Sequence, residues 1–281
     1  ATAGALDRQA NADYRARRVA LAEKAKGGVV VLFAATEAEG PSAIYGFRQD
    51  DNFFYLTGWK EPGAAIVIAP AGAVSPVAPL HPYIEILFLP QRNNTQERWT
   101  GPKLGPENDD AARITGFDRV ERLDKLRDEL ERLVSKPRAT VYSDLPAYGE
   151  TSPDPGPLDW LRRSNAFPNY VAFLDVKPML AELRVKKDAG ELERIRKATD
   201  ASIAAHFSAM HAMKPGMTER EISGLMQYEF MKRGCERPAY SPIVGSGLNS
   251  TVLHYSEDSG PIENGDVVVM DVAGEYSMYA S

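Results

Sequence analysis

The stretch 267–281, "VVVMDVAGEYSMYAS", joins a run of apolar, mostly β-branched residues to a single acid, Asp271. The run from Val267 to Met270 is typical of a buried strand, so we expect that strand to carry Asp271 into the protein interior. A carboxylate is costly to desolvate unless it gains a partner. A neighbouring backbone, an arginine or a bound cation would each serve, and the spacing favours a structural role at least as much as a metal. A turn is predicted at Gly274.

The preceding stretch 240–266, "YSPIVGSGLNSTVLHYSEDSGPIENGD", predicts a strand, a tight turn at Gly245–Gly247, a loop with His254, and a second turn at 263–266. The glycines do not form a nucleotide-binding fingerprint, because Ser250 stands where the third glycine belongs and no helical pattern follows. A single histidine beside a tyrosine is more often a structural group than a catalytic one. The pattern alone therefore leaves the role of His254 open.

Helical patterns dominate the region before this stretch. Residues 217–234, "MTEREISGLMQYEFMKRG", predict a helix that Thr218 caps with Glu221 as a capping box, and that Gly234 ends. An extended piece at 175–178 followed by a long helical pattern places a domain boundary near residue 178. Two histidines of that region are assigned structural roles because they share a helix with apolar residues: His206 and His211, with Ile203, Phe207 and Met210.

The first half of the chain alternates predicted helices and strands. We expect a helix at 9–26 and strands at 27–35, 64–70, 84–90 and 140–144. Residues 118–134 predict an amphipathic helix, and its short leucine pattern favours packing on a sheet over a coiled coil. His81 and residues 151–157 are predicted to lie in loops. This alternation is typical of an α/β layer structure.

Composition sets further bounds. A length of 281 residues favours two domains, and 43% hydrophobic with 26% charged residues is ordinary for a globular protein. The net charge of −6, with both signs scattered, argues against a nucleic-acid partner. Cys235 is the single cysteine, so no disulfide framework exists. No apolar run reaches the length of a membrane span, so no membrane partner is expected. We expect a cytoplasmic protein, although a start at Ala1 also fits a periplasmic or secreted one.

Five stretches carry a family resemblance, and they follow one another in order along the chain. They are "FRQDDNFFYLTGWKEPGAAIVI" (47–68), "LFLPQRNNTQERWTGPKLG" (87–105), "LRVKKDAGELERIRKATD" (183–200), "PGMTEREI" (215–222) and "AYSPIVGSGLNSTVLHY" (239–255). Together they resemble the aminopeptidase P (Xaa-Pro aminopeptidase) branch of the pita-bread metallopeptidases. The resemblance spans nearly all of residues 7–281.

The resemblance implies a fold and a division into domains. Residues 1–177 would form an α/β N-terminal domain with a mixed sheet, of the creatinase/aminopeptidase P N-terminal type. Residues 178–281 would form the first part of an α+β pita-bread catalytic domain, which would be incomplete.

The resemblance also implies a metal centre. In the family, two aspartates, a histidine and two glutamates hold two divalent metal ions. Asp271 matches the first aspartate, while the second would come eleven residues later, beyond Ser281, and the others further on. The remaining ligands are expected in a longer polypeptide or on a second chain, and residues 1–281 alone are expected to be inactive. Oxygen-rich sites suit hard ions, so manganese (Mn2+) is expected, with Zn2+ or Co2+ as alternatives.

The implied activity is removal of the N-terminal residue from proline-containing (Xaa-Pro) peptides by a hydroxide bridging two metals. His254 matches the histidine of the "LHY" motif, which would line the cleft and hydrogen-bond to the substrate. Tyr240 matches a tyrosine that supports the metal aspartates. Trp99 matches a tryptophan that reaches a neighbour's active site in tetrameric members, so a homodimer or homotetramer is expected. Tyr240 and Trp99 could equally be residues that only pack against their neighbours.

Two other functions fit the same fold. Prolidases share the metal site and cut only dipeptides, although "FFYLTGWKEPG" looks closer to the aminopeptidase branch. Histone chaperones reuse the fold as a non-catalytic binding module. The presence of both Asp271 and His254 argues against the second alternative.

Overall fold

A computed structural model of the chain describes residues 6–37, 45–71, 82–135, 138–145 and 171–281. His81 and the loop predicted at 151–157 lie outside these residues. The chain divides into two compact units, Gln9–Lys186 and Ala1–Arg8 with Lys187–Ser281. This division falls a few residues after the boundary predicted near residue 178.

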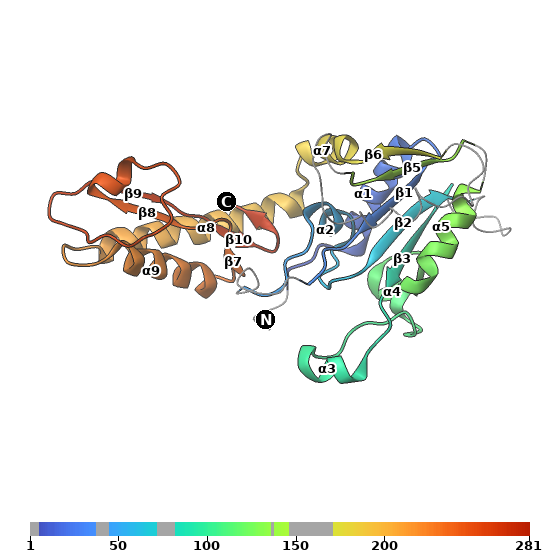
Figure 1. Cartoon of the computed structure of the whole chain (residues 1–281), viewed down its shortest axis with the longest axis horizontal. Helices are drawn as coiled ribbons and strands as arrows, with labels where there is room; N and C mark the ends of the chain where they lie inside the picture. Colours follow the sequence, from blue (N-terminus) through green and yellow to red (C-terminus); the bar gives the residue numbers. More distant parts are fainter. Residues whose placement is uncertain (1–5, 38–44, 72–81, 136–137, 146–170) are drawn as a thin grey trace. The chain divides into compact units, whose positions relative to one another are not determined.

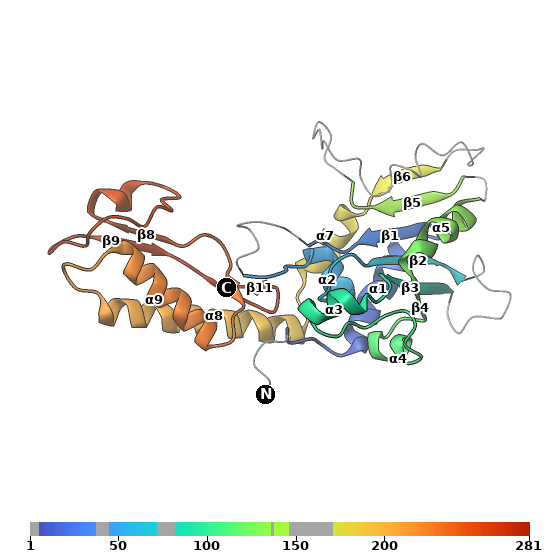
Figure 2. The ribbon, with the colours of Figure 1, turned by 60° about the horizontal axis from the view of Figure 1, so that its bottom comes forward.

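A six-stranded sheet is the centre of the first unit (Figure 1), and its strand order is β4-β3-β2-β1-β5-β6 (Figure 2). β2 pairs antiparallel with β1 and β3, whereas the pairs β3–β4, β1–β5 and β5–β6 are parallel. The mixed sheet expected for this domain is therefore confirmed. The strands are β1 (Val29–Phe33), β2 (Ala65–Pro70), β3 (Tyr83–Leu89), β4 (Arg119–Arg122), β5 (Thr140–Ser143) and β6 (Ala172–Asp175).

Helices cover both faces of this sheet, which explains why its central strands are apolar at successive positions. On one face, α1 (Asn11–Lys24), α2 (Asp51–Thr57) and α7 (Lys177–Val185) pack against alternate residues of β1, β2 and β3. On the other face, α5 (Leu126–Val134) packs against the residues between them (Figure 2). Short helices α3 (Asn94–Thr100) and α4 (Ala111–Thr115) lie in the connection between β3 and β4.

The helix predicted at 118–134 is wrong in its first part. Residues Arg119–Arg122 form strand β4, a 3-10 turn follows at Leu123–Lys125, and the helix begins at Leu126. Pairing with β3 decides the conformation of this segment, because Val120 lies beside Leu87 in a parallel ladder. The buried leucines of α5 pack on the sheet, as the sequence favoured.

The second unit pairs two helices with two small sheets. α8 (Ala189–Ala212) and α9 (Glu219–Lys232) enclose a core with a three-stranded sheet of order β11-β10-β7 and a two-stranded sheet of β8 and β9. Its strands are β7 (Arg237–Pro238), β8 (Ile243–Ser246), β9 (Val268–Asp271), β10 (Gly274–Tyr276) and β11 (Tyr279–Ala280). In no described part of the chain is there a helix with the length and apolar character needed to cross a membrane.

The capping prediction for α9 is confirmed. The Thr218 side chain accepts a hydrogen bond from the Glu221 amide, and the Glu221 carboxylate accepts one from the Thr218 amide. Gly234 follows the helix with a positive φ of 90°. The turn predicted at Gly274 is wrong, because Gly274 lies in β10 and the chain turns at Ser277 and Met278 instead.

The glycine turn predicted at 245–247 begins later than expected. Gly245 and Ser246 belong to β8, and the 3-10 helix η4 (Gly247–Thr251) follows them. Gly247 has a positive φ of 55°, so the change of direction occurs at this residue.

Candidate functional site

Asp271 ends β9 and is exposed, so the expectation that it is buried is wrong for the described structure. It lies opposite Ile243 in the antiparallel pair of β8 and β9. Val268 and Met270 pack against the core, and their alternation places Val269 and Asp271 on the other face. Val269 and Asp271 are both exposed on that face, which leaves the carboxylate accessible.

Tyr240 and Asp271 are brought together by the pairing of the segments that carry them. The Tyr240 hydroxyl donates a hydrogen bond to Oδ1 of Asp271. Burial of the phenol and this bond to a carboxylate raise the pKa of Tyr240 to about 12. The tyrosine therefore stays protonated and acts as a donor, which orients the carboxylate and leaves Oδ2 for another partner.

His254 lies on the loop that follows η4, and its side chain is exposed. Its backbone is left-handed, with φ at 58°, a conformation that few residues other than glycine adopt. No hydrogen bond joins His254 to Tyr240 or Asp271 within the described residues. The next residue, Tyr255, is fixed instead by a 2.7 Å hydrogen bond from its hydroxyl to Glu219.

The described residues do not form a metal centre by themselves. Across the described ranges, no three His, Cys, Asp or Glu side chains gather where they could hold an ion. Asp271 offers the hard oxygen ligand that ions such as manganese prefer. Its exposure and its hydrogen bond to Tyr240 suit a ligand that is oriented from one side.

Trp99 belongs to the first unit, where it lies on α3. Its side chain is 88% exposed, so it does not pack within the described chain. An indole so exposed is a feature of surfaces that bind partners. The sequence pattern alone did not predict α3, although Asn93 caps it by accepting from the Thr95 and Gln96 amides.

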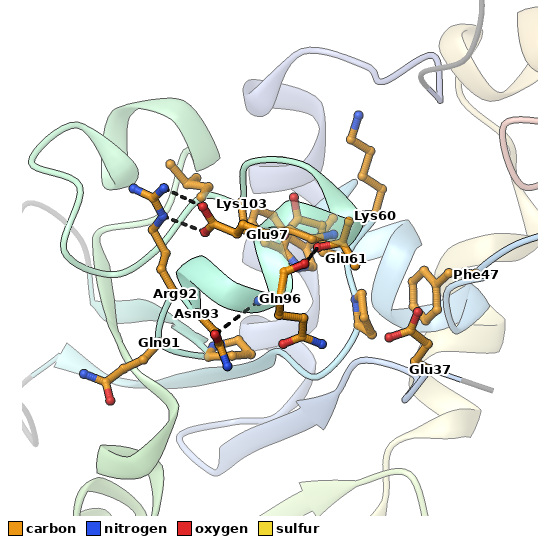
Figure 3. Close-up of a pocket in the computed structure, with 15 residues that line it drawn as sticks. Glu37, Phe47, Lys60, Glu61, Gln91, Arg92, Asn93, Gln96, Glu97 and Lys103 are labelled. Carbon is orange, nitrogen blue, oxygen red and sulfur yellow. Dashed lines mark hydrogen bonds and ion pairs between the residues drawn. The ribbon is translucent and has the colours of Figure 1, made fainter. Parts of the chain in front are cut away.

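The same helix helps to line a pocket of about 280 Å3 in the first unit (Figure 3). Arg92 and Glu97 form a two-bond ion pair there, with N–O distances of 2.7 and 2.6 Å. Burial raises the pKa of Glu61, while Lys103 and Lys60 oppose that rise. Trp99 is not among the lining residues, and the pocket holds none of the predicted site residues.

Both histidines on α8, which were predicted to be structural, contact a backbone carbonyl of their own helix. His206 contacts the Ser202 carbonyl at 2.8 Å, and His211 contacts the Phe207 carbonyl at 2.7 Å. Each bond joins a histidine to the residue one helical turn earlier.

Family models match both units of the chain. The model for the aminopeptidase P N-terminal domain matches residues 14–142, and the model for metallopeptidase family M24 matches residues 193–281. The chain belongs to the aminopeptidase P branch of the M24 metallopeptidases. Its fold of a mixed-sheet N-terminal domain joined to part of an M24 domain follows that family.

Relatives of this aminopeptidase P family member agree in sequence and structure. The Xaa-Pro aminopeptidase of Escherichia coli K12 is 31% identical over 274 residues, which are 95% of this chain and 60% of the relative. Human Xaa-Pro aminopeptidase 3 is 28% identical, over 90% of this chain and 48% of the relative. The chain thus spans about 60% of the length of its bacterial relative.

Solved structures give the same result. Escherichia coli aminopeptidase P with the inhibitor Pro-Leu matches with a TM-score of 0.81 at 31% identity, covering 98% of this chain and 61% of that one. Pseudomonas aeruginosa aminopeptidase PepP matches with a TM-score of 0.83, again at 31% identity and with the same coverage.

Proposed function

We propose that the protein is a metal-dependent aminopeptidase that removes the first residue from peptides with proline in second position. The observation that carries this proposal is the Tyr240–Asp271 pair, an oriented carboxylate at the end of a strand in a chain of the M24 family. The relatives named Xaa-Pro aminopeptidase support the substrate class.

The proposed cofactors are two divalent metal ions, with manganese as the expected metal and Zn2+ or Co2+ as alternatives. When bound, such a pair supplies a hydroxide and polarises a peptide carbonyl. Asp271 would hold metal through its free oxygen, and Tyr240 would fix the direction of the carboxylate by donating to Oδ1. The His254 side chain would form a hydrogen bond with the peptide near the bond that is cut.

The proposed partners are the peptide substrate and further copies of the chain, as a homodimer or homotetramer, or a second chain with the remaining ligands. The exposure of Trp99 supports self-association, because an exposed indole is a strong anchor for an interface. Light scattering of wild type and Trp99→Ala tests this: the substitution should lower the molar mass. Equal masses for both proteins would argue against a role for Trp99.

Peptide hydrolysis tests the activity directly. We expect the polypeptide with a complete ligand set, dialysed against chelator and reloaded with Mn2+, to release the first residue of an Xaa-Pro-Xaa tripeptide. The tripeptide with alanine in place of proline is the matched control. A preference for the Xaa-Pro dipeptide would instead assign a prolidase, and no release after metal loading would contradict the proposal. Residues 1–281 alone should release nothing, because they contribute a single ligand.

A further inference from the structure

The fully buried side chain of Glu219 contacts one end of the 246–260 loop, the segment that carries His254. Glu219 is the first residue of α9 and follows the N-cap residue Thr218. Its Oε1 accepts hydrogen bonds from the Ser246 amide at 2.7 Å and from Nδ2 of Asn249 at 3.0 Å. Both donors precede His254 in the chain.

The second oxygen of this carboxylate reaches the other end of the loop. Oε2 accepts from the Tyr255 hydroxyl at 2.7 Å and from the Gly260 amide at 2.6 Å. A carboxylate offers about four acceptor positions, and four donors from one loop occupy them here. One side chain therefore ties together residues on both sides of His254.

These bonds also set the charge of Glu219. Burial by itself would raise the pKa of this carboxyl, but the hydrogen bonds from Ser246, Asn249, Tyr255 and Gly260 outweigh burial and lower it. The group is thus ionised at neutral pH, which strengthens each of the four bonds.

The backbone at the start of α9 is joined to the same loop. The Glu219 amide donates to the Gly260 carbonyl at 3.0 Å, and Thr218 forms a β-bridge with Pro261. A Cβ at Gly260 would lie 2.7 Å from Nδ2 of Asn249 and 3.0 Å from Oε1 of Glu219. A side chain at position 260 would therefore displace the Asn249 amide or the Glu219 carboxylate, so the absence of one lets the loop approach Glu219 closely.

His254 lies between the residues that Glu219 binds, and it has a left-handed backbone and an exposed side chain. We propose that Glu219 is a positioning residue, whose carboxylate holds the 246–260 loop in the conformation that presents the His254 imidazole to a bound peptide. This inference rests on the proposed function, in which His254 binds the substrate. Glu219 would act through the loop and without touching the peptide.

The substitution Glu219→Gln tests the need for a carboxylate at nearly unchanged volume. It replaces one acceptor oxygen by an NH2 group, which would face two donors and lose their bonds. The matched control is Glu229→Gln, on the same helix. Glu229 is also buried, but it pairs with Arg233 and Lys232 and has no contact with the loop.

A double-mutant cycle in the complete, metal-loaded protein is the first test. We expect Glu219→Gln to lower kcat/KM for the tripeptide about 10–100-fold, as is typical for residues that orient an active-site group. The double variant Glu219→Gln/His254→Ala should be no slower than His254→Ala, because the positioning effect requires His254. Glu229→Gln should keep kcat/KM unchanged. Effects of Glu219→Gln and His254→Ala that multiply independently would overturn the proposal.

A second test needs no activity and separates this inference from the proposed function. In NMR spectra of the 281-residue chain, Glu219→Gln should shift the His254 imidazole resonances and remove the exchange protection of whichever amide, Ser246 or Gly260, faces the new NH2 group. Glu229→Gln should leave all of these signals in place. Unchanged His254 resonances in Glu219→Gln would overturn the proposal. If the complete protein releases nothing from the tripeptide, the proposed function fails and this measurement still decides the role of Glu219.

Discussion

The guanidinium of Arg18 on α1 and the carboxylate of Glu85 on β3 form an ion pair with an N–O distance of 2.8 Å and no exposure of either side chain. Arg18 also donates to the carbonyls of Leu56 and Gly116 at 2.9 Å each, so it joins α1 and β3 to α2 and to the end of α4. Burial raises the pKa of Glu85, against the opposing effect of Arg18.

Breaking this pair should destabilise the first unit strongly. We expect Arg18→Met to lower the free energy of unfolding by about 3–5 kcal/mol, because it leaves the Glu85 carboxylate buried without a cation. The double variant Arg18→Met/Glu85→Met should cost less than the sum of the single variants. Urea denaturation measures these free energies of unfolding. The control is Arg127→Met, because Arg127 forms an exposed ion pair with Glu131, and its loss should cost about 0–1 kcal/mol. Additive costs would show that the pair is not coupled.

Tyr240 should influence metal binding through Asp271. In the polypeptide with a complete ligand set, Tyr240→Phe removes the hydroxyl that orients the carboxylate, so Mn2+ affinity should fall about 10–100-fold. Titration calorimetry measures this change. Tyr228→Phe, on an exposed part of α9, is the control. Equal Mn2+ affinities for wild type and Tyr240→Phe would show that Tyr240 has no role in metal binding.

Glu219 should make stability depend on pH. Its pKa is lowered in the folded state, so its contribution is present above the unfolded-state pKa of about 4.3 and is lost as pH falls through the lower folded value. The difference in unfolding free energy between wild type and Glu219→Gln should therefore be largest near neutral pH and shrink on acidification below that value. Denaturation at a series of pH values measures it, and a constant difference would contradict the assignment.

Two glycines of the second unit should respond to alanine in opposite directions. A Cβ at Gly274 would lie 2.9 Å from the Cys235 sulfur and 3.2 Å from a ring carbon of Phe230, so Gly274→Ala should cost about 1–3 kcal/mol. Gly224→Ala lies within α9 with no atom near the added methyl, and should stabilise by about 0.5–1 kcal/mol. Thermal denaturation measures the melting temperature of both variants. Melting temperatures that shift in the same direction for both would contradict the packing at β10.

Cys235 should be unreactive while the protein is folded. Burial, with smaller effects from Glu236 and Glu275, raises the pKa of this thiol to about 11. At pH 8 only about one thiol in a thousand would be ionised, and the thiolate is the reactive form. Labelling by a disulfide reagent should require denaturant. Rapid labelling of the native protein would show that the thiol is accessible.

The strands of the first unit could be predicted from sequence where burial on both faces made them continuously apolar, as in β1 and β2. β4 could not, because its Val120 continues the helical spacing of the leucines that follow, and only the ladder with β3 makes it a strand. α2 was missed since seven residues are too short for a periodic pattern, although Asp50 and Gly58 at its ends are cap signals.

The site was less predictable than the fold. The apolar run before Asp271 indicated a strand but not which face would be covered, so the exposure of Asp271 could not be foreseen. Thr218 and Glu221 drew attention to the start of α9, while Glu219 between them follows no pattern. Its role depends on four donors that lie 27 to 41 positions away in the chain.

The place of β1 in the sheet has a consequence for the order of folding. β1 pairs on one side with β2 and on the other with β5, whose residues Thr140–Ser143 are made much later during synthesis. The antiparallel pairs β1–β2 and β2–β3 can form first, while the β5 side of β1 stays open and prone to wrong pairing. Pulsed hydrogen exchange during refolding should therefore protect the β2 and β3 amides before those of β5. Simultaneous protection would mean that the whole sheet forms in one step.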